Sequence, residues 1–208
     1  MRSKYLIVLF FIFLCTKALG QSIQIQSKNI TINKNNETTI FENEVVVKTE
    51  NKTITSDFVK YDKKKRFLIF RKNIVAKDNY NNIIEADYAE YSELKKILIT
   101  TGQTKITTSE SYIIEAEDIL FDNKNKFINS KNKSILKDLD GNQIYLENFE
   151  YLINENIFKS IGYIKIEDQK KNVYEFSQIY IDTKKKEILG TDIKSYLNQD
   201  NFKINELN

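Results

Sequence analysis

The stretch IEADYAEY, Ile84–Tyr91, recurs along the chain and decides how it folds. The similar stretch ITSDFVKY (Ile54–Tyr61) starts thirty residues before it, and IEAEDILF (Ile114–Phe121) starts thirty residues after it. In all three the first, third, sixth and eighth positions are apolar or small, and the positions between them are mostly polar. Steps of two residues are the period of a β-strand. The single step of three indicates a β-bulge, which bends the strand while its apolar face stays inward.

The same period covers almost the whole chain after residue 20. Ile144 and Tyr174 continue the series that passes through Ile54, and an earlier copy starts at Ile25. A polar turn such as Asp62–Lys65 follows each stretch, and a second strand with alternating apolar residues follows the turn. The sequence therefore predicts an all-β protein, in which six two-strand copies supply about twelve antiparallel strands in one domain.

The composition excludes several classes of function. The 208 residues contain no His, Pro or Trp, and only one Cys. Without histidine the chain lacks the commonest general base and the commonest transition-metal ligand. A histidine-based triad, a Cys–His dyad, a zinc site and an intrachain disulfide are therefore excluded. Apolar residues make up 41% of the chain, which favours a packed core over disorder.

The first twenty residues are typical of a secretory signal peptide. Arg2 and Lys4 precede the apolar run Leu6–Leu14, and the small residues of Ala18–Gly20 follow it. We predict cleavage after residue 20, which leaves residues 21–208 as the exported domain. An uncleaved membrane anchor is the first alternative, although the run is only about half of the ~20 residues that span a bilayer. Acylation of Cys15 is the second alternative, and the bulky Leu14 before this cysteine argues against acylation.

Loss of this segment changes the charge balance. Arg2, Lys4 and Lys17 would leave with it, and residues 1–20 contain no acidic side chain. Of the 32 basic residues 29 would remain, equal in number to the 29 acidic residues. A balanced and interspersed surface has no concentrated positive field for nucleic acid, which we therefore do not expect as a partner.

One acidic residue per copy raises the question of chemistry. These residues are Asp57, Asp87, Glu117 and Glu147. Stacked carboxylates can bind Ca²⁺ or act as an acid and base pair. The glycine and asparagine spacing of calcium loops is absent around them, and we favour a solvent-facing position at the bulge, surrounded by lysines. We expect no catalytic residue, no metal and no cofactor.

Two sets of motifs resemble a known family. The first is Ile84–Asp87 (IEAD) and Ile114–Glu117 (IEAE), each followed by an aromatic residue and a polar turn. The second is Phe41–Val47 (FENEVVV) and Phe70–Val75 (FRKNIV). Together they resemble the OstA-like repeats of lipopolysaccharide transport, found in the periplasmic bridge protein LptA and in the periplasmic N-terminal domain of LptD. The resemblance spans roughly residues 23–195. It implies an elongated antiparallel β-jellyroll, an open roll whose apolar groove passes lipid A acyl chains.

The resemblance also implies a role and a location. We expect a non-catalytic component in the periplasm or at the outer membrane of a Gram-negative bacterium, which carries lipopolysaccharide toward the outer membrane. It is either a stand-alone LptA-like bridge protein or the N-terminal part of an LptD-like translocon. The expected partners are lipopolysaccharide, other jellyroll proteins of the bridge and an outer-membrane barrel. The alternatives are a small outer-membrane β-barrel and an exported polysaccharide-active repeat protein.

Open sheet edges would join such proteins end to end. An open roll leaves one edge near Ile23–Ile32 and another near Ile188–Tyr196, and exposed edges favour pairing with further strands.

The inward columns supply candidates for the groove. Composition alone favours a dry, fully packed core, whereas the resemblance favours a slot that small residues such as Ser56, Ala86 and Ala116 keep open. The lipid-groove candidates are Ile54, Ser56, Val59, Tyr61, Ile84, Ala86, Ala89, Tyr91, Ile114, Ala116, Ile119 and Phe121.

Overall fold

The structure is a computed structural model that describes residues 23–35 and 37–202. The signal peptide predicted over residues 1–20 lies outside these ranges. The strands are β1 (Gln24–Gln26), β2 (Asn29–Asn33), β3 (Thr38–Lys48), β4 (Lys52–Asp62), β5 (Phe67–Asp78), β6 (Ile83–Ser92), β7 (Ile97–Thr100), β8 (Gln103–Thr107), β9 (Ile113–Glu117), β10 (Leu120–Asp122), β11 (Phe127–Ser130), β12 (Ser134–Lys137), β13 (Gln143–Leu146), β14 (Phe149–Leu152), β15 (Ile157–Glu167), β16 (Val173–Asp182), β17 (Glu187–Thr191) and β18 (Lys194–Tyr196). A 3₁₀ helix, Gln199–Phe202, follows them. Within the described ranges, no helix has the length and apolar character needed to cross a membrane.

The eighteen strands correspond to twelve passes, where a pass is one crossing of the sheet by the chain from one turn to the next. Six passes run through as single strands, namely β3, β4, β5, β6, β15 and β16. Each of the other six is interrupted near its middle, which gives the pairs β1/β2, β7/β8, β9/β10, β11/β12, β13/β14 and β17/β18. Neighbouring passes pair antiparallel in a single sheet. The expected all-β antiparallel architecture is therefore confirmed. The structure has more strands than the twelve expected because six passes lose their pairing near the middle and each of these counts as two strands.

Bulges bend the passes at the predicted step of three, but the extra residue lies on the paired strands β3, β5 and β15, and not on β4, β6 and β16 as the sequence predicted. The register between β3 and β4 shifts between Glu42 and Val45, so that Asn43 and Glu44 together lie opposite Asp57 alone. Asn43 and Glu44 have positive φ angles of 66° and 54°. Equivalent shifts interrupt the pairing of β4 with β5, of β5 with β6 and of β15 with β16. The shift in register bends both paired strands while their apolar side chains stay on one side.

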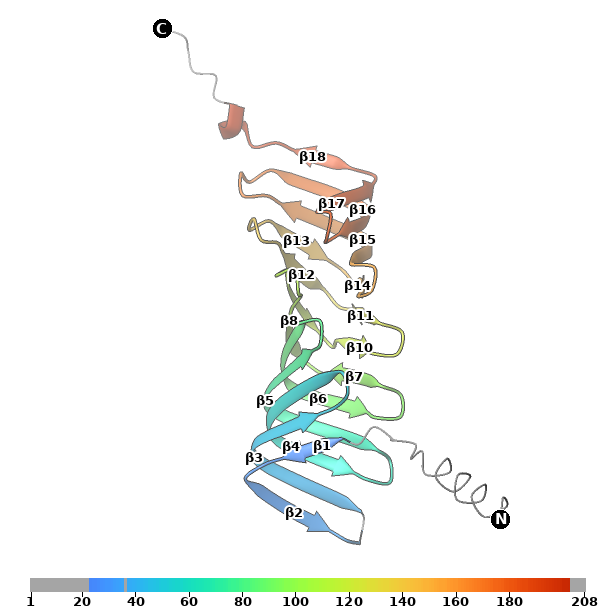
Figure 1. Cartoon of the computed structure of the whole chain (residues 1–208). Helices are drawn as coiled ribbons and strands as arrows, with labels where there is room; N and C mark the ends of the chain where they lie inside the picture. Colours follow the sequence, from blue (N-terminus) through green and yellow to red (C-terminus); the bar gives the residue numbers. More distant parts are fainter. Residues whose placement is uncertain (1–22, 36, 203–208) are drawn as a thin grey trace, which may run out of the picture.

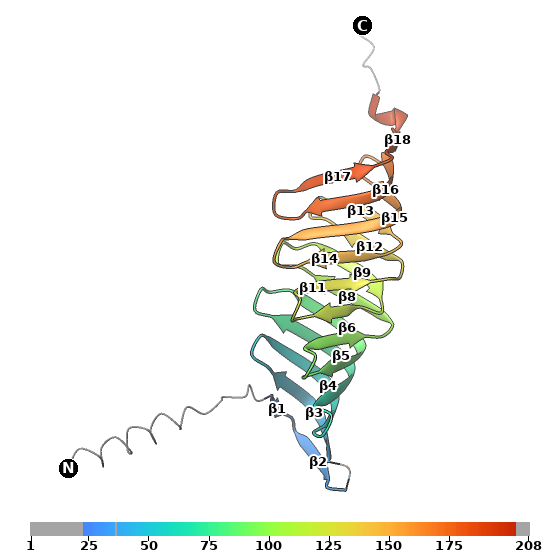
Figure 2. The same ribbon diagram turned by 90° about the vertical axis from the view of Figure 1, so that its right-hand side faces the viewer.

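The bends divide the sheet lengthwise into two layers. The first layer contains β2, β7, β10, β11, β14 and β17, and the second contains β1, β8, β9, β12, β13 and β18. Each through strand contributes one half to each layer. Figures 1 and 2 show the result as a long twisted stack with β2 at one end and β18 at the other. The sheet is thus folded along its length into an elongated open roll.

A row of apolar residues runs through each layer. In the first layer, register partners on successive passes are Tyr61, Leu68, Tyr91, Leu98, Phe121, Ile128, Tyr151, Phe158 and Ile181. In the second they are Val47, Ile54, Ala76, Ile84, Ile106, Ile114, Leu136, Ile144 and Ile166. Their buried members belong to one core cluster between the layers. The thirty-residue period is therefore an advance of two passes along the stack.

Candidate lipid-binding interior

The twelve groove candidates all belong to this interior. Eleven of them are buried, and Tyr61 near the first end is half-buried. They lie on β4, β6, β9 and β10, except for Ile119, which joins β9 to β10. Glu85 and Glu115 alternate with them and point outward, where they pair with Lys105 and Lys137 at 3.2 and 2.9 Å. The sequence pattern thus separated inward from outward side chains correctly.

The small candidates lie at the inner corner where the layers meet. Ser56 borders the bend, and its hydroxyl donates a hydrogen bond to the Arg71 carbonyl at 2.9 Å. In the last copy Phe176 occupies the position equivalent to Ser56, and Gly190 lies next to it in the first layer. A Cβ on Gly190 would lie 2.2 Å from the Phe176 ring. The corner has no room for large side chains on both layers, so the small residues fit this crowding.

The interior has little free volume next to Ile84 and Phe121. A cavity of about 10 Å³ lies between the layers and is bordered by Ile84 and Phe121, among others. This is room for one water molecule, far less than an acyl chain needs. Residence of an acyl chain between the layers would therefore require the layers to move apart. The lipid role of the twelve residues stays a prediction.

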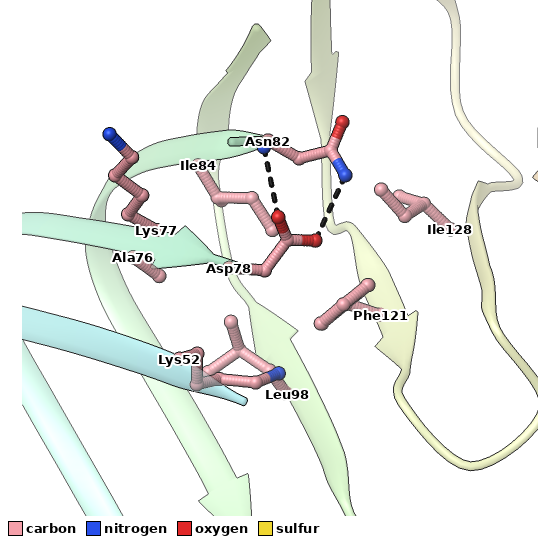
Figure 3. A pocket seen from close by; sticks show the side chains of 9 residues that line it. All are labelled: Lys52, Ala76, Lys77, Asp78, Asn82, Ile84, Leu98, Phe121 and Ile128. Carbon is pink, nitrogen blue, oxygen red and sulfur yellow. Dashed lines mark hydrogen bonds between the residues drawn. The ribbon is translucent and has the colours of Figure 1, made fainter. Parts of the chain in front are cut away.

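The sequence analysis missed one polar residue of this interior. Lys52, the first residue of β4, is only 4% exposed. Its Nζ lies 3.9 Å from the centroid of the Phe121 ring and 5.6 Å from that of Tyr91, both on the opposite layer. Burial lowers the pKa of Lys52 to about 7, although the negative charge of Asp78 acts in the other direction. Figure 3 shows Lys52 together with Phe121 and Asp78. The sequence signal for its inward direction was its position two residues before the inward Ile54, because side chains two residues apart on a strand lie on the same face.

A second set of polar residues closes the turns of the second layer. Asn82 donates from its backbone N and its side-chain Nδ2 to the Asp78 carboxylate, both at 2.9 Å (Figure 3). The same clamp recurs in Asp138–Asn142 and Asp168–Asn172. The Oδ1 of Asn82 also accepts a hydrogen bond from the backbone N of Ser109 in the next copy. The sequence signal for these turns was an Asp followed four residues later by an Asn, which recurs in three copies. The hydrogen bonds of these residues stabilise the stack.

The acidic column lies at the bends, on the outside of the interior. The Asp57 carboxylate accepts a hydrogen bond from Asn73 at 2.7 Å, and that of Glu117 accepts one from Gln103 at 2.7 Å. Each partner belongs to the neighbouring pass at the same bend. Over residues 23–35 and 37–202, no three such side chains gather in a group that could hold a metal ion. The geometry therefore assigns Asp57 and Glu117 to local contacts at the bends.

Comparison with known proteins gives distant likenesses. No protein-family model matches the chain, and no curated protein matches its sequence. One similar structure is that of LptH, the LptA homologous periplasmic component of the conserved lipopolysaccharide transport device from Pseudomonas aeruginosa. It shows 11% identity over 86% of this chain and 96% of that chain, with a TM-score of 0.24. Another is the wild-type TCP10 domain of Danio rerio CPAP in complex with a peptide of Danio rerio STIL. It shows 10% identity over 73% of this chain and 97% of that chain, with a TM-score of 0.16. Likeness at this level transfers no function to this chain.

Proposed function

We propose that this protein is a non-catalytic, exported component of lipopolysaccharide transport, which takes lipid A acyl chains between its two layers and passes them along the stack. The observation that carries the proposal is the row of apolar side chains between the layers, which follows the long axis from Val47 in the first copy to Ile166 in the fifth. The resemblance to OstA-like repeats supports the same role, as does the predicted signal peptide. No reaction is needed, which suits a chain without histidine.

The energetics of this interior suit a carrier. Burial of one methylene group is worth about 0.8 kcal/mol, so a few segments of an acyl chain would suffice for reversible binding. The acyl chain would replace contacts that the two layers make with each other. The net affinity would be the free energy of burying the acyl chain minus the free energy of the layer contacts that are lost. The layers are joined covalently only through the bends, and therefore their separation at the opposite long edge breaks no strand pairing within a layer.

The ends of the stack would connect it to its partners. The first and last passes, β1/β2 and β17/β18, each pair with one neighbouring pass among the described residues. A strand with one free side can pair with another jellyroll protein of the bridge, or continue into an outer-membrane domain. We keep both the LptA-like and the LptD-like version of the proposal.

Site-specific photo-crosslinking in cells tests the proposal. A photoreactive residue replaces Ile84, Tyr91 or Ile114, which already have large inward side chains, and Glu85 or Glu115 at outward positions of the same strands. We expect lipopolysaccharide adducts from the inward set only, because only those side chains contact the space between the layers.

The paired design makes the result decisive. Variants that reach the same expression level and melting temperature as the parent protein are compared. Equal capture at both sets, or capture at neither, would mean that the interior is a permanently closed core and that the transport function is wrong.

A further inference from the structure

Lys52 is the one buried side-chain nitrogen or oxygen without a hydrogen-bond partner in the part of the chain that the structure describes. Its ammonium contacts the Phe121 ring instead, and Lys52 borders a small cavity together with Ala76, Ile84 and Leu98. A buried cation without a paired anion is costly, and a bound anion would relieve that cost. The Asp78 carboxylate, which lines the same cavity, is already engaged, because both of its oxygens accept hydrogen bonds from Asn82. Lys52 thus has an unused capacity to bind an anion.

Space for a ligand adjoins this ammonium. The 10 Å³ cavity at Lys52 shares Phe121 and Asp78 with a second cavity of about 70 Å³, which Lys126 also lines. The second cavity holds several water-sized groups, enough for one phosphate. It lies at the long edge opposite the bends. There the turn residues Asn51 and Asn79 of the second layer lie near the turn residue Asn123 of the first layer. The Phe121 ring lines both cavities and lies against the Lys52 ammonium, so a ligand that contacts both lysines would take the place of the ring.

The surrounding charges favour a doubly charged anion. Lys96 and Lys126 both lower the pKa of Lys52 through their positive charge, and Asp78 is the one acidic group that raises it appreciably. Among the residues that line the two cavities, Lys52, Lys77 and Lys126 are basic and Asp78 is the one acidic residue, so positive charge is in excess when Lys52 is protonated. A phosphate monoester carries about −1.5 to −2 at neutral pH and offers three acceptor oxygens, so it matches this excess better than a carboxylate does.

We propose that Lys52 and Lys126 form a binding subsite for the phosphate monoester of an amphiphile, at the long edge where its acyl chains enter between the layers. The inference rests on the proposed function for the acyl chains, but the phosphate site is separable from it. The phosphate takes the place of the Phe121 ring at the Lys52 ammonium, and displacement of this ring loosens the contact between the two layers. Headgroup binding and opening of the interior are thereby coupled.

The test measures the affinity of the mature chain for matched ligands by titration calorimetry. The ligands are dioctanoyl phosphatidic acid, dioctanoylglycerol, which has the same chains without the phosphate, and inorganic phosphate. The variants are Lys52→Met and Lys126→Met, with Lys77→Met as the control. Lys77 borders the same cavity but its ammonium points away from it (Figure 3). Methionine replaces the stem of lysine with an apolar chain of similar length, so each variant is expected to fold, which circular dichroism checks.

We expect the parent protein to bind phosphatidic acid about tenfold to hundredfold more tightly than dioctanoylglycerol, the range for hydrogen bonds to a charged group. Lys52→Met abolishes this preference and leaves the affinity for dioctanoylglycerol unchanged, Lys126→Met weakens the preference, and Lys77→Met keeps it. A preference that survives in Lys52→Met, or its absence from the parent protein, would overturn the phosphate site.

The two proposals fail separately. If inorganic phosphate binds as tightly as phosphatidic acid, and Lys52→Met abolishes its binding, the site recognises free phosphate and the lipid part of the inference is wrong. If both lipids bind equally and the photo-crosslinks form, the transport function stands and the Lys52 site is wrong. If neither lipid binds while phosphate does, the phosphate site stands without the transport function.

Discussion

A lysine whose ammonium is shielded from water holds its proton less tightly than one at the surface. In the folded chain burial lowers the pKa of Lys52 from 10.5 to about 7, and its charge faces the rings of Phe121 and Tyr91 rather than a hydrogen-bond acceptor of the described structure. Because the folded state holds this proton less tightly than the unfolded state does, the free energy of unfolding depends on pH.

The free energy of unfolding should rise with pH between about 7 and 10.5, the two pKa values of Lys52. In this window the unfolded chain binds a proton that the folded chain has lost, so the slope is positive and reaches at most about 1.4 kcal/mol per pH unit. Urea denaturation at a series of pH values measures it. Above about pH 10 ionisation of the unfolded tyrosines acts in the opposite direction, because burial raises the pKa of Tyr91 and Tyr151 to about 12.

Lys52→Met separates this contribution from all other titrating groups. The variant should be more stable than the parent protein near pH 7, since it removes the buried cation, and its stability should no longer rise across the window. A rise of the same size in the variant would show that Lys52 is not the group responsible.

At the scale of the strands, the bends decide which side chains fit inside. The layers approach most closely at the inner corner, where Ser56, Ala86 and Ala116 occupy the second layer. The last copy replaces these small residues with Phe176, and Gly190 on the first layer makes the room that its ring needs. Small and large residues therefore complement each other across the corner, as dense interior packing requires.

Gly190→Ala should lower the free energy of unfolding by about 1–3 kcal/mol, because the new methyl group displaces the Phe176 ring. In a Phe176→Ala background the same substitution should cost less, because only the close contact with the Gln178 backbone oxygen at 3.1 Å remains. Chemical denaturation of the four proteins of this double-mutant cycle gives the coupling.

Gly102→Ala is the control for this cycle. Gly102 also lies at a bend but has no atom within 4 Å of its would-be Cβ, and its φ of +81° makes alanine cost about 1 kcal/mol through the backbone alone. That cost should be the same in the parent protein and in the Phe176→Ala background. Additive effects of Gly190→Ala and Phe176→Ala would contradict the crowded corner.

At the scale of the whole molecule, the apolar rows of the interior continue onto the terminal passes. Ile30 on β2 is the register partner of buried Phe41, and Ile188 on β17 is that of buried Ile181. The two isoleucines are nevertheless 55% and 47% exposed, because no further pass in the described structure covers them. Both ends of the stack thus combine a free strand edge with uncovered core residues, which favours association with another sheet.

We expect the mature chain to associate end to end, with an affinity that Ile30→Lys or Ile188→Lys weakens about tenfold or more. Burial of one isoleucine is worth about 1.5–3 kcal/mol, which corresponds to this factor. Sedimentation over a range of concentrations measures it. Leu94→Lys is the control, because Leu94 is 63% exposed in a turn away from both ends. A monomer at every concentration, or equal weakening by all three variants, would refute association through the ends.

The amino-acid sequence by itself determined the strands, their order and the face that each side chain occupies. The thirty-residue period and the step of three in Ile84–Tyr91 contain this information, because strand pairing and bulges are local consequences of the pattern. The distance between the layers was decided only by tertiary structure. The sequence alone suggests that Ala86 and Ala116 leave open volume, but in three dimensions both are buried at the corner where the layers meet. Lys52 illustrates the same limit, because its neighbour Phe121 lies more than two copies further along the chain and reaches it only across the folded sheet.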